Sequence, residues 1–398
     1  MKTTQCRCGN RLFFGNPICI SCQTPVALCD GCDSITPIDL DPPAANASAD
    51  DPPSSDAASS DGASTGSSAA CESAADESTT GGSATVESTT GESVLDDSAS
   101  ERTRDTAPCD RCHRVLRWCA NHARGVCGGG VVVDGSDDSA NSDDSNLCKY
   151  CRLNATIPDL GTSGNLEKWG RLENAKRRVL YDIAASGLPI DDETLPLRFD
   201  FLAATDDAPV STGHANGLIT IDIAEADSVI RERTRVEFGE PQRTLVGHFR
   251  HELGHYYWQL IVEPNMLDAC RELFGDETDP TYVEARDVYY ANGPVADWPL
   301  RFVSAYASMH PWEDFAETFA MYFDIIAILN TAEDFKRVVG PKHPGDFKSM
   351  IRSFMEIGLA ANAMNRDLGL IDLVPEVLVD PVLDKLKFIH KMVNQDTA

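Results

Sequence analysis

The chain has 398 residues, enough for two or three domains of ordinary size. With 34 Lys+Arg against 63 Asp+Glu, its formal net charge is −29, which argues against general electrostatic binding to nucleic acid or to an anionic membrane. No apolar run reaches the roughly 20 residues of a membrane span, and the first residues contain no apolar signal segment. We therefore expect no membrane association and a cytoplasmic location.

In the reducing cytoplasm, the 14 cysteines are not expected to form disulfides, and the spacing of twelve of them predicts metal binding instead. Residues 1–40 contain two short-spaced cysteine pairs that predict a zinc ribbon, since four thiolates on two turns can surround one zinc ion. The four predicted ligands of this structural zinc are Cys6, Cys8, Cys19 and Cys22.

Residues 41–105 form an acidic segment rich in Ser, Thr, Ala and Gly, and we predict a disordered insert because it has almost no large apolar side chains. A second zinc-knuckle region is predicted at 106–151, interrupted by a smaller acidic insert at 134–146. Cys71 and Cys270 have no sequence partner and are interpreted as ordinary thiols.

Two further ligand sets are predicted from the remaining pairs: Cys119, Cys127, Cys148 and Cys151 for one structural zinc, and Cys29, Cys32, Cys109 and Cys112 for a possible third. The pairing stays open, because His113 and His122 compete as ligands. A four-thiolate site leaves no open coordination position, so these ions are expected to be structural. The ribbons could bind a protein partner, whereas the few scattered basic residues make nucleic acid an unlikely one.

Residues 152–398 are expected to fold as one α+β domain with a small sheet and several helices. Apolar spacing predicts helices at 166–185, 242–262, 311–329 and 344–364, and strands at 195–202 and 217–223. The second strand is a candidate for a sheet edge that pairs with an extended peptide.

The segment His251-Glu252-Leu253-Gly254-His255 predicts a catalytic zinc site. His251 and His255, four residues apart on a helix, share one face and can bind the same ion. Glu252 is placed to act as general base toward a zinc-activated water.

A third ligand must come from elsewhere, and Glu313 is the best candidate, with Glu317 one turn later accepting a hydrogen bond from a ligand imidazole. The reverse assignment, with Glu317 as ligand and Glu313 as a helix N-terminal acid, stays open. Tyr306 could donate a hydrogen bond to the oxyanion of the reaction, or be a core residue.

Several motifs together resemble the bacterial family of zinc-ribbon "putative zinc-binding metallopeptidases", which is gluzincin-like. They are Cys6-Arg7-Cys8-Gly9, Leu12-Phe13-Phe14, Cys19-x2-Cys22, Cys148-x2-Cys151-Arg152-Leu153-Asn154, Thr212-Gly213-His214-x-Asn216-Gly217, His248-Phe249-Arg250-His251-Glu252-x-Gly254-His255-Tyr256-Tyr257-Trp258, and Ser304-Ala305-Tyr306-Ala307-Ser308-x-His310-Pro311-Trp312-Glu313-Asp314. The spacing of Tyr306, Glu313 and Glu317 is also similar to the catalytic domain of anthrax lethal factor. That likeness implies Glu313 as ligand, Tyr306 as transition-state donor and Glu317 as hydrogen-bond partner of a ligand.

The leading hypothesis is therefore a zincin-like metallopeptidase that hydrolyses a peptide or protein substrate, with one catalytic and two or three structural zinc ions. The N-terminal ribbons would serve as a structural or partner-recognition adaptor. The alternative is a non-catalytic, zinc-stabilised module that binds protein or nucleic acid.

Overall fold

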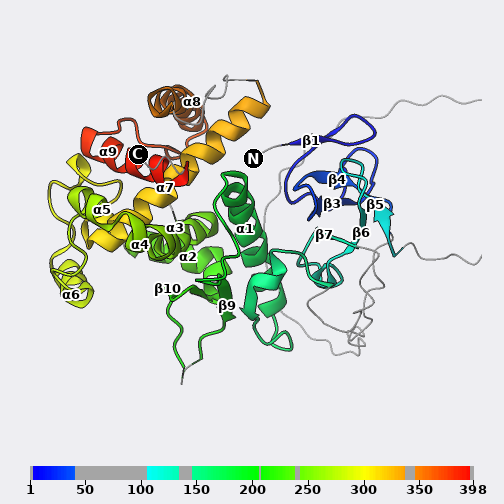
Figure 1. The fold of residues 1–398 in the computed structure, drawn as a ribbon, viewed down its shortest axis with the longest axis horizontal. Helices are drawn as coiled ribbons and strands as arrows, with labels where there is room; N and C mark the ends of the chain where they lie inside the picture. Colours follow the sequence, from blue (N-terminus) through cyan, green and yellow to red (C-terminus); the bar gives the residue numbers. More distant parts are fainter. Residues whose placement is uncertain are drawn as a thin grey trace, which may run out of the picture. The chain divides into compact units, whose positions relative to one another are not determined.

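The computed structural model describes residues 3–40, 105–133, 146–205, 208–237, 243–336 and 346–394 (Figure 1). The two predicted acidic inserts lie outside these residues except for Asp105 and Asn146, and so does Cys71. All described residues belong to one structural unit.

The cysteine-rich part contains two small sheets. The strands β1 (Thr4–Gln5) and β2 (Arg11–Leu12) form an antiparallel pair. The second sheet has the order β4-β3-β7-β6-β5, with β3 at Val26–Cys29, β4 at Ile35–Pro37, β5 at Ala107–Pro108, β6 at Val115–Trp118 and β7 at Gly129–Val132. Because β3 pairs with β7 in parallel, the segments on either side of the long insert share one sheet.

The remaining sheet has the order β10-β11-β9-β8, with β8 at Asn154–Thr156, β9 at Arg198–Leu202, β10 at Gly213–Ala215 and β11 at Leu218–Asp222. On β9 and β11 alternate side chains are buried, as period-2 patterning requires. The predicted strands at 195–202 and 217–223 are confirmed with shorter bounds, but the second is internal rather than an edge. The reason is the turn at Asn216-Gly217, both with positive φ, which folds β10 back onto β11 as the edge strand.

The helices are α1 (Asn165–Ala185), α2 (Ser228–Glu237), α3 (Leu245–Tyr257), α4 (Glu263–Asn265), α5 (Leu267–Phe274), α6 (Tyr282–Asn292), α7 (Pro311–Asp334), α8 (Phe347–Asp367) and α9 (Asp380–Val393). A π-helical turn at Trp258–Val262 extends α3, and 3₁₀ turns occupy Ala120–His122, Cys151–Leu153, Ile223–Ala226, Trp298–Leu300 and Tyr306–Ser308. The four predicted helices are confirmed with shifted ends, and the α+β class is confirmed.

The helix α7 packs against α3, α8 and α9 (Figure 1). Within the described part of the chain it is the one helix long and apolar enough to cross a membrane by length and composition. It nevertheless packs in the core: Phe315, Phe319 and Phe323 along it are fully buried. This is the behaviour of a central helix in a folded domain.

Candidate metal centres

The helix α3 places both imidazoles of the His-Glu-x-x-His segment on its buried side. Thr244 caps the helix by accepting a hydrogen bond from the Gly247 amide, and this cap fixes the residue at which the helix begins. Gly254 allows α3 to approach α7 closely, because a Cβ there would lie 2.8 Å from Ala316 Cα. Close packing of these two helices brings the metal donors together.

The helix α7 supplies the carboxylates. His310 caps it through Nδ1, which accepts a hydrogen bond from the Trp312 amide, and Pro311 is the first helical residue. Glu313 therefore lies in the first turn and Glu317 one turn later on the same face.

Three donor atoms converge between the helices. His251 Nε2 lies 3.1 Å from His255 Nε2 and 3.0 Å from Glu313 Oε2, and His255 Nε2 lies 3.5 Å from the same oxygen. Tetrahedral zinc with ligands at about 2.0–2.1 Å would hold them about 3.3 Å apart. The donor set and its dimensions thus fit a His-His-Glu zinc centre with Glu313 as the third ligand.

Glu317 occupies a different position from Glu313. Its Oε1 lies 2.6 Å from His251 Nδ1, and its Oε2 accepts a hydrogen bond of 2.7 Å from Ser304 Oγ. A carboxylate on the far nitrogen of a ligand imidazole fixes the tautomer and ring orientation. The geometry therefore favours Glu313 over Glu317 as the metal ligand.

The charges in this cluster are strongly coupled. Burial disfavours the charged form of His251, but its hydrogen bonds with Glu313 and Glu317 raise the pKa of this imidazole well above its usual range. Burial also disfavours the charged form of Glu313 and by itself raises its pKa, yet His255 and His251 lower the pKa of its carboxyl well below the usual value. The carboxylate of Glu313 therefore stays ionised, as a metal ligand must be.

Glu252 is buried, and its Oε2 has no hydrogen-bond partner among the described residues. A buried, unsatisfied carboxylate oxygen is costly unless water or a ligand completes it. The side chain comes from the helix that carries the two imidazoles, so it can accept a proton close to them.

Tyr306 also lies at this site, with its ring centroid 6.0 Å from that of His251. Burial, reinforced by the nearby charge of Glu313, raises the pKa of its phenol. It therefore remains a hydrogen-bond donor at neutral pH.

The cysteines form three clusters in the described residues: Cys6, Cys8, Cys19 and Cys22; Cys29, Cys32, Cys109 and Cys112; and Cys119, Cys127, Cys148 and Cys151. Sulfur separations of 3.5 Å (Cys6–Cys22), 3.7 Å (Cys29–Cys112) and 3.6 Å (Cys127–Cys148) represent the three sets. Tetrahedral zinc with Zn–S bonds of about 2.3 Å holds its sulfurs about 3.8 Å apart. Each cluster therefore fits a four-thiolate zinc site.

A repeated turn shapes these clusters. Gln23, Asp33 and His113 each follow the second cysteine of a pair, have positive φ, and donate their amide to the carbonyl of the pair's first cysteine. The tight turn points both sulfurs the same way. His113 thus belongs to the turn, and neither it nor His122 is part of a cluster.

The third cluster lies within the main hydrophobic core together with Trp169 and Val179 of α1. Arg177 of α1 is buried and donates a hydrogen bond to Cys127 Sγ. This cluster is therefore continuous with the domain that carries the His-His-Glu centre. Cys270, predicted as an ordinary thiol, is buried away from all clusters, and burial raises its pKa to about 12.

Sequence reasoning missed Tyr282, Ser304 and Trp312. The ring centroids of Trp312 and His255 lie 3.9 Å apart, and Tyr282 donates a hydrogen bond to Glu313. Trp312 and Ser304 lie next to or two residues from predicted site residues in the sequence, and this nearness could have indicated them. Tyr282 lies 31 residues before Glu313, and nothing in the local sequence indicated its contact with that residue.

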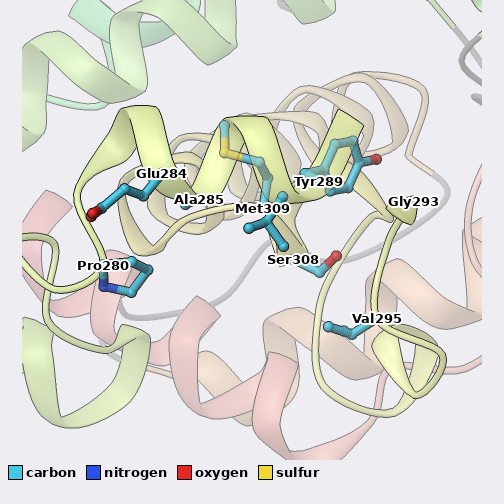
Figure 2. Close-up of a pocket in the computed structure, with 9 residues that line it drawn as sticks. Pro280, Glu284, Ala285, Tyr289, Gly293, Val295, Ser308 and Met309 are labelled. Carbon is cyan, nitrogen blue, oxygen red and sulfur yellow. The ribbon is translucent and has the colours of Figure 1, made fainter. Parts of the chain in front are cut away.

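A pocket of about 200 Å³ lies beside α6, with Met309 between Ala285 and Tyr289 in its wall (Figure 2). Its other lining residues are Pro280, Glu284, Val288, Gly293, Val295 and Ser308. None of the metal donors lines it.

The fold and the donor sets define a class: an α+β domain whose described residues include a His-His-Glu donor set and clusters of four cysteines, each able to hold a metal ion. The chain belongs to the family described as "Putative zinc-binding metallo-peptidase", which matches residues 165–392. The Mycobacterium bovis protein "Uncharacterized protein Mb2598c" and the Mycobacterium tuberculosis protein "Uncharacterized protein Rv2568c" are each 40% identical over 265 residues, spanning 63% of this chain and 76% of the relative. No solved structure matches the chain.

Proposed function

We propose that the protein is a zinc-dependent peptidase that hydrolyses peptide bonds of a peptide or protein substrate. The observation that carries the proposal is the His251, His255 and Glu313 donor triangle, together with the unsatisfied carboxylate oxygen of Glu252 on the helix that supplies the two imidazoles. A structural zinc site has no need for a buried free carboxylate, whereas hydrolysis needs a base there.

Each side chain then has a defined role. Zinc held by the three donors would polarise the scissile carbonyl and acidify a water molecule. Glu252 takes a proton from the attacking water and delivers it to the leaving amine. Tyr306 donates a hydrogen bond to the oxyanion, and Glu317 holds the His251 ring in orientation.

The edge strand β10 offers a place for the substrate backbone. Among the described strands it is paired on one side only. Burial, and to a smaller extent the nearby charge of His255, lower the pKa of His214 on this strand to about 4. An extended peptide added to this edge would pass beside the metal centre.

The proposal includes one catalytic and three structural zinc ions, one for each cysteine cluster. The cysteine-rich part would act as a structural element and an adaptor for a protein partner. Thiolate sites of this kind persist where thiols stay reduced, as in the cytoplasm.

The test compares wild type with Glu252→Gln in cleavage of a proteome-derived peptide library, with zinc content measured for both. The variant should keep its zinc and lose about 10²–10⁴-fold in turnover, since proton transfer is removed. Glu263→Gln, an exposed glutamate beyond the same helix, is the matched control and should match wild type. Unchanged turnover in Glu252→Gln would exclude this base. A fully zinc-loaded wild type that cleaves nothing but holds a stable partner would favour the binding-module alternative.

A further inference from the structure

Tyr282 makes a contact that the reaction scheme above does not use. Its phenol donates a 2.9 Å hydrogen bond to Glu313 Oε1, while Oε2 of the same carboxylate faces the imidazoles of His251 and His255. One oxygen of the proposed ligand is thus held by the protein, and the other is left for the metal.

The Tyr282 side chain is itself firmly placed. It is the first residue of α6, whose start is fixed by a reciprocal capping box between Thr281 and Glu284. Its ring packs edge-to-face against His310, at 5.3 Å, and against Trp312, at 5.9 Å. These contacts hold the phenol beside Oε1 of the Glu313 carboxylate.

We propose that Tyr282 is a positioning residue that restricts Glu313 to binding zinc through one oxygen. This inference rests on the proposed function. A carboxylate that bound through both oxygens would occupy a fourth coordination position, which a catalytic zinc site must leave open for water or substrate. Tyr282 therefore contributes both to zinc affinity and to the open position.

Tyr282→Phe tests the proposal because it keeps the ring contacts and removes only the hydroxyl. After a chelator has removed the accessible ion and zinc analysis has shown the cysteine-bound ions retained, the protein is titrated with Zn²⁺ against a competing chelator. We expect about 10–100-fold weaker binding, the usual loss when a partner of a metal ligand is removed. Co²⁺ loaded into the same site should show weaker visible absorption than in wild type, because that intensity falls as coordination number rises.

Tyr322→Phe is the matched control: it also loses one buried hydroxyl hydrogen bond beside α7, to His390 Nδ1 at 2.9 Å, away from the donors. It should bind Zn²⁺ as wild type does. Wild-type affinity and an unchanged Co²⁺ spectrum in Tyr282→Phe would overturn the inference, as would an equal loss in Tyr322→Phe.

His255→Ala separates this inference from the proposed function. If His255→Ala loses the accessible ion while Tyr282→Phe keeps wild-type affinity, only the role of Tyr282 fails. If His255→Ala keeps the ion, the proposed centre itself is wrong and the inference fails with it.

Discussion

Gly254→Ala tests whether the close approach of α3 and α7 is what assembles the metal centre. The added Cβ would lie 2.8 Å from Ala316 Cα, 3.1 Å from Ala316 O and 3.2 Å from Ala316 Cβ. Carbon atoms in good contact are about 3.5–4.0 Å apart, so the helices must separate by roughly 1 Å. Because the obstacle is backbone, no side-chain rotation can relieve it.

The expected magnitude follows from two opposing terms. Replacing a mid-helix glycine with alanine gains about 0.5–1 kcal/mol in helix propensity, whereas overpacking a close helix contact costs about 1–3 kcal/mol. We expect a net loss of about 1–2 kcal/mol, which for a domain of this size lowers the melting temperature by about 2–8 °C. A separation of roughly 1 Å would also move Glu313 away from the imidazoles and weaken zinc binding at least about 10-fold.

Thermal denaturation and Zn²⁺ titration of the accessible site measure both effects. Gly170→Ala on α1 is the control, because its added Cβ would meet only Val126 Cγ2, at 3.9 Å. That variant should be as stable as wild type or more so. A Gly254→Ala protein with wild-type melting and wild-type zinc affinity would refute the reasoning.

Three further outcomes are expected. Glu317→Gln should weaken zinc binding about 10–100-fold, because the acceptor on His251 Nδ1 loses its charge; unchanged affinity in the titration would contradict it. Lys176→Ala should lower the free energy of unfolding by about 3–5 kcal/mol in denaturant titrations, since it leaves the charge of the fully buried Glu173 without its partner. The double change Lys176→Met with Glu173→Leu should lower this free energy much less, because it removes both charges. Burial by itself raises the pKa of Glu225, but its hydrogen bonds with His248 and Thr212 lower the pKa overall. The ionised Glu225 therefore stabilises the fold above its ordinary pKa, and this contribution is lost as the pH falls through the lowered pKa. The difference in free energy of unfolding between wild type and Glu225→Gln should therefore shrink in acid. A difference independent of pH would contradict this.

The His-Glu-x-x-His segment could be read from the sequence because its information is local: residues four apart on one helix share a face. The short cysteine pairs were likewise predictable, because each forms its turn locally, whereas the way in which pairs combine into clusters stayed open until the structure joined them. The family and the α+β class followed from the same motifs.

What could not be predicted depends on contacts between distant segments. The pairing of β3 with β7 spans the long insert, and no local pattern specifies it. The short β10 is a strand only because the Asn216-Gly217 turn returns it to β11. Tyr282 reaches Glu313 from the first turn of α6, and the mixed polarity of that helix gives little sign of this contact. The C-terminal helix α9, by contrast, carries Val382, Leu386 and Ile389 at helical spacing and was open to prediction.

An anomalous-difference map from crystals of the zinc-loaded protein, recorded on both sides of the zinc absorption edge, tests the central claim most directly. We predict a zinc peak within bonding distance of His251 Nε2, His255 Nε2 and Glu313 Oε2, with an open position toward Glu252, and one peak inside each cysteine cluster. Peaks at the cysteine clusters alone, or a metal bound through Glu317 with Glu313 turned away, would contradict the account.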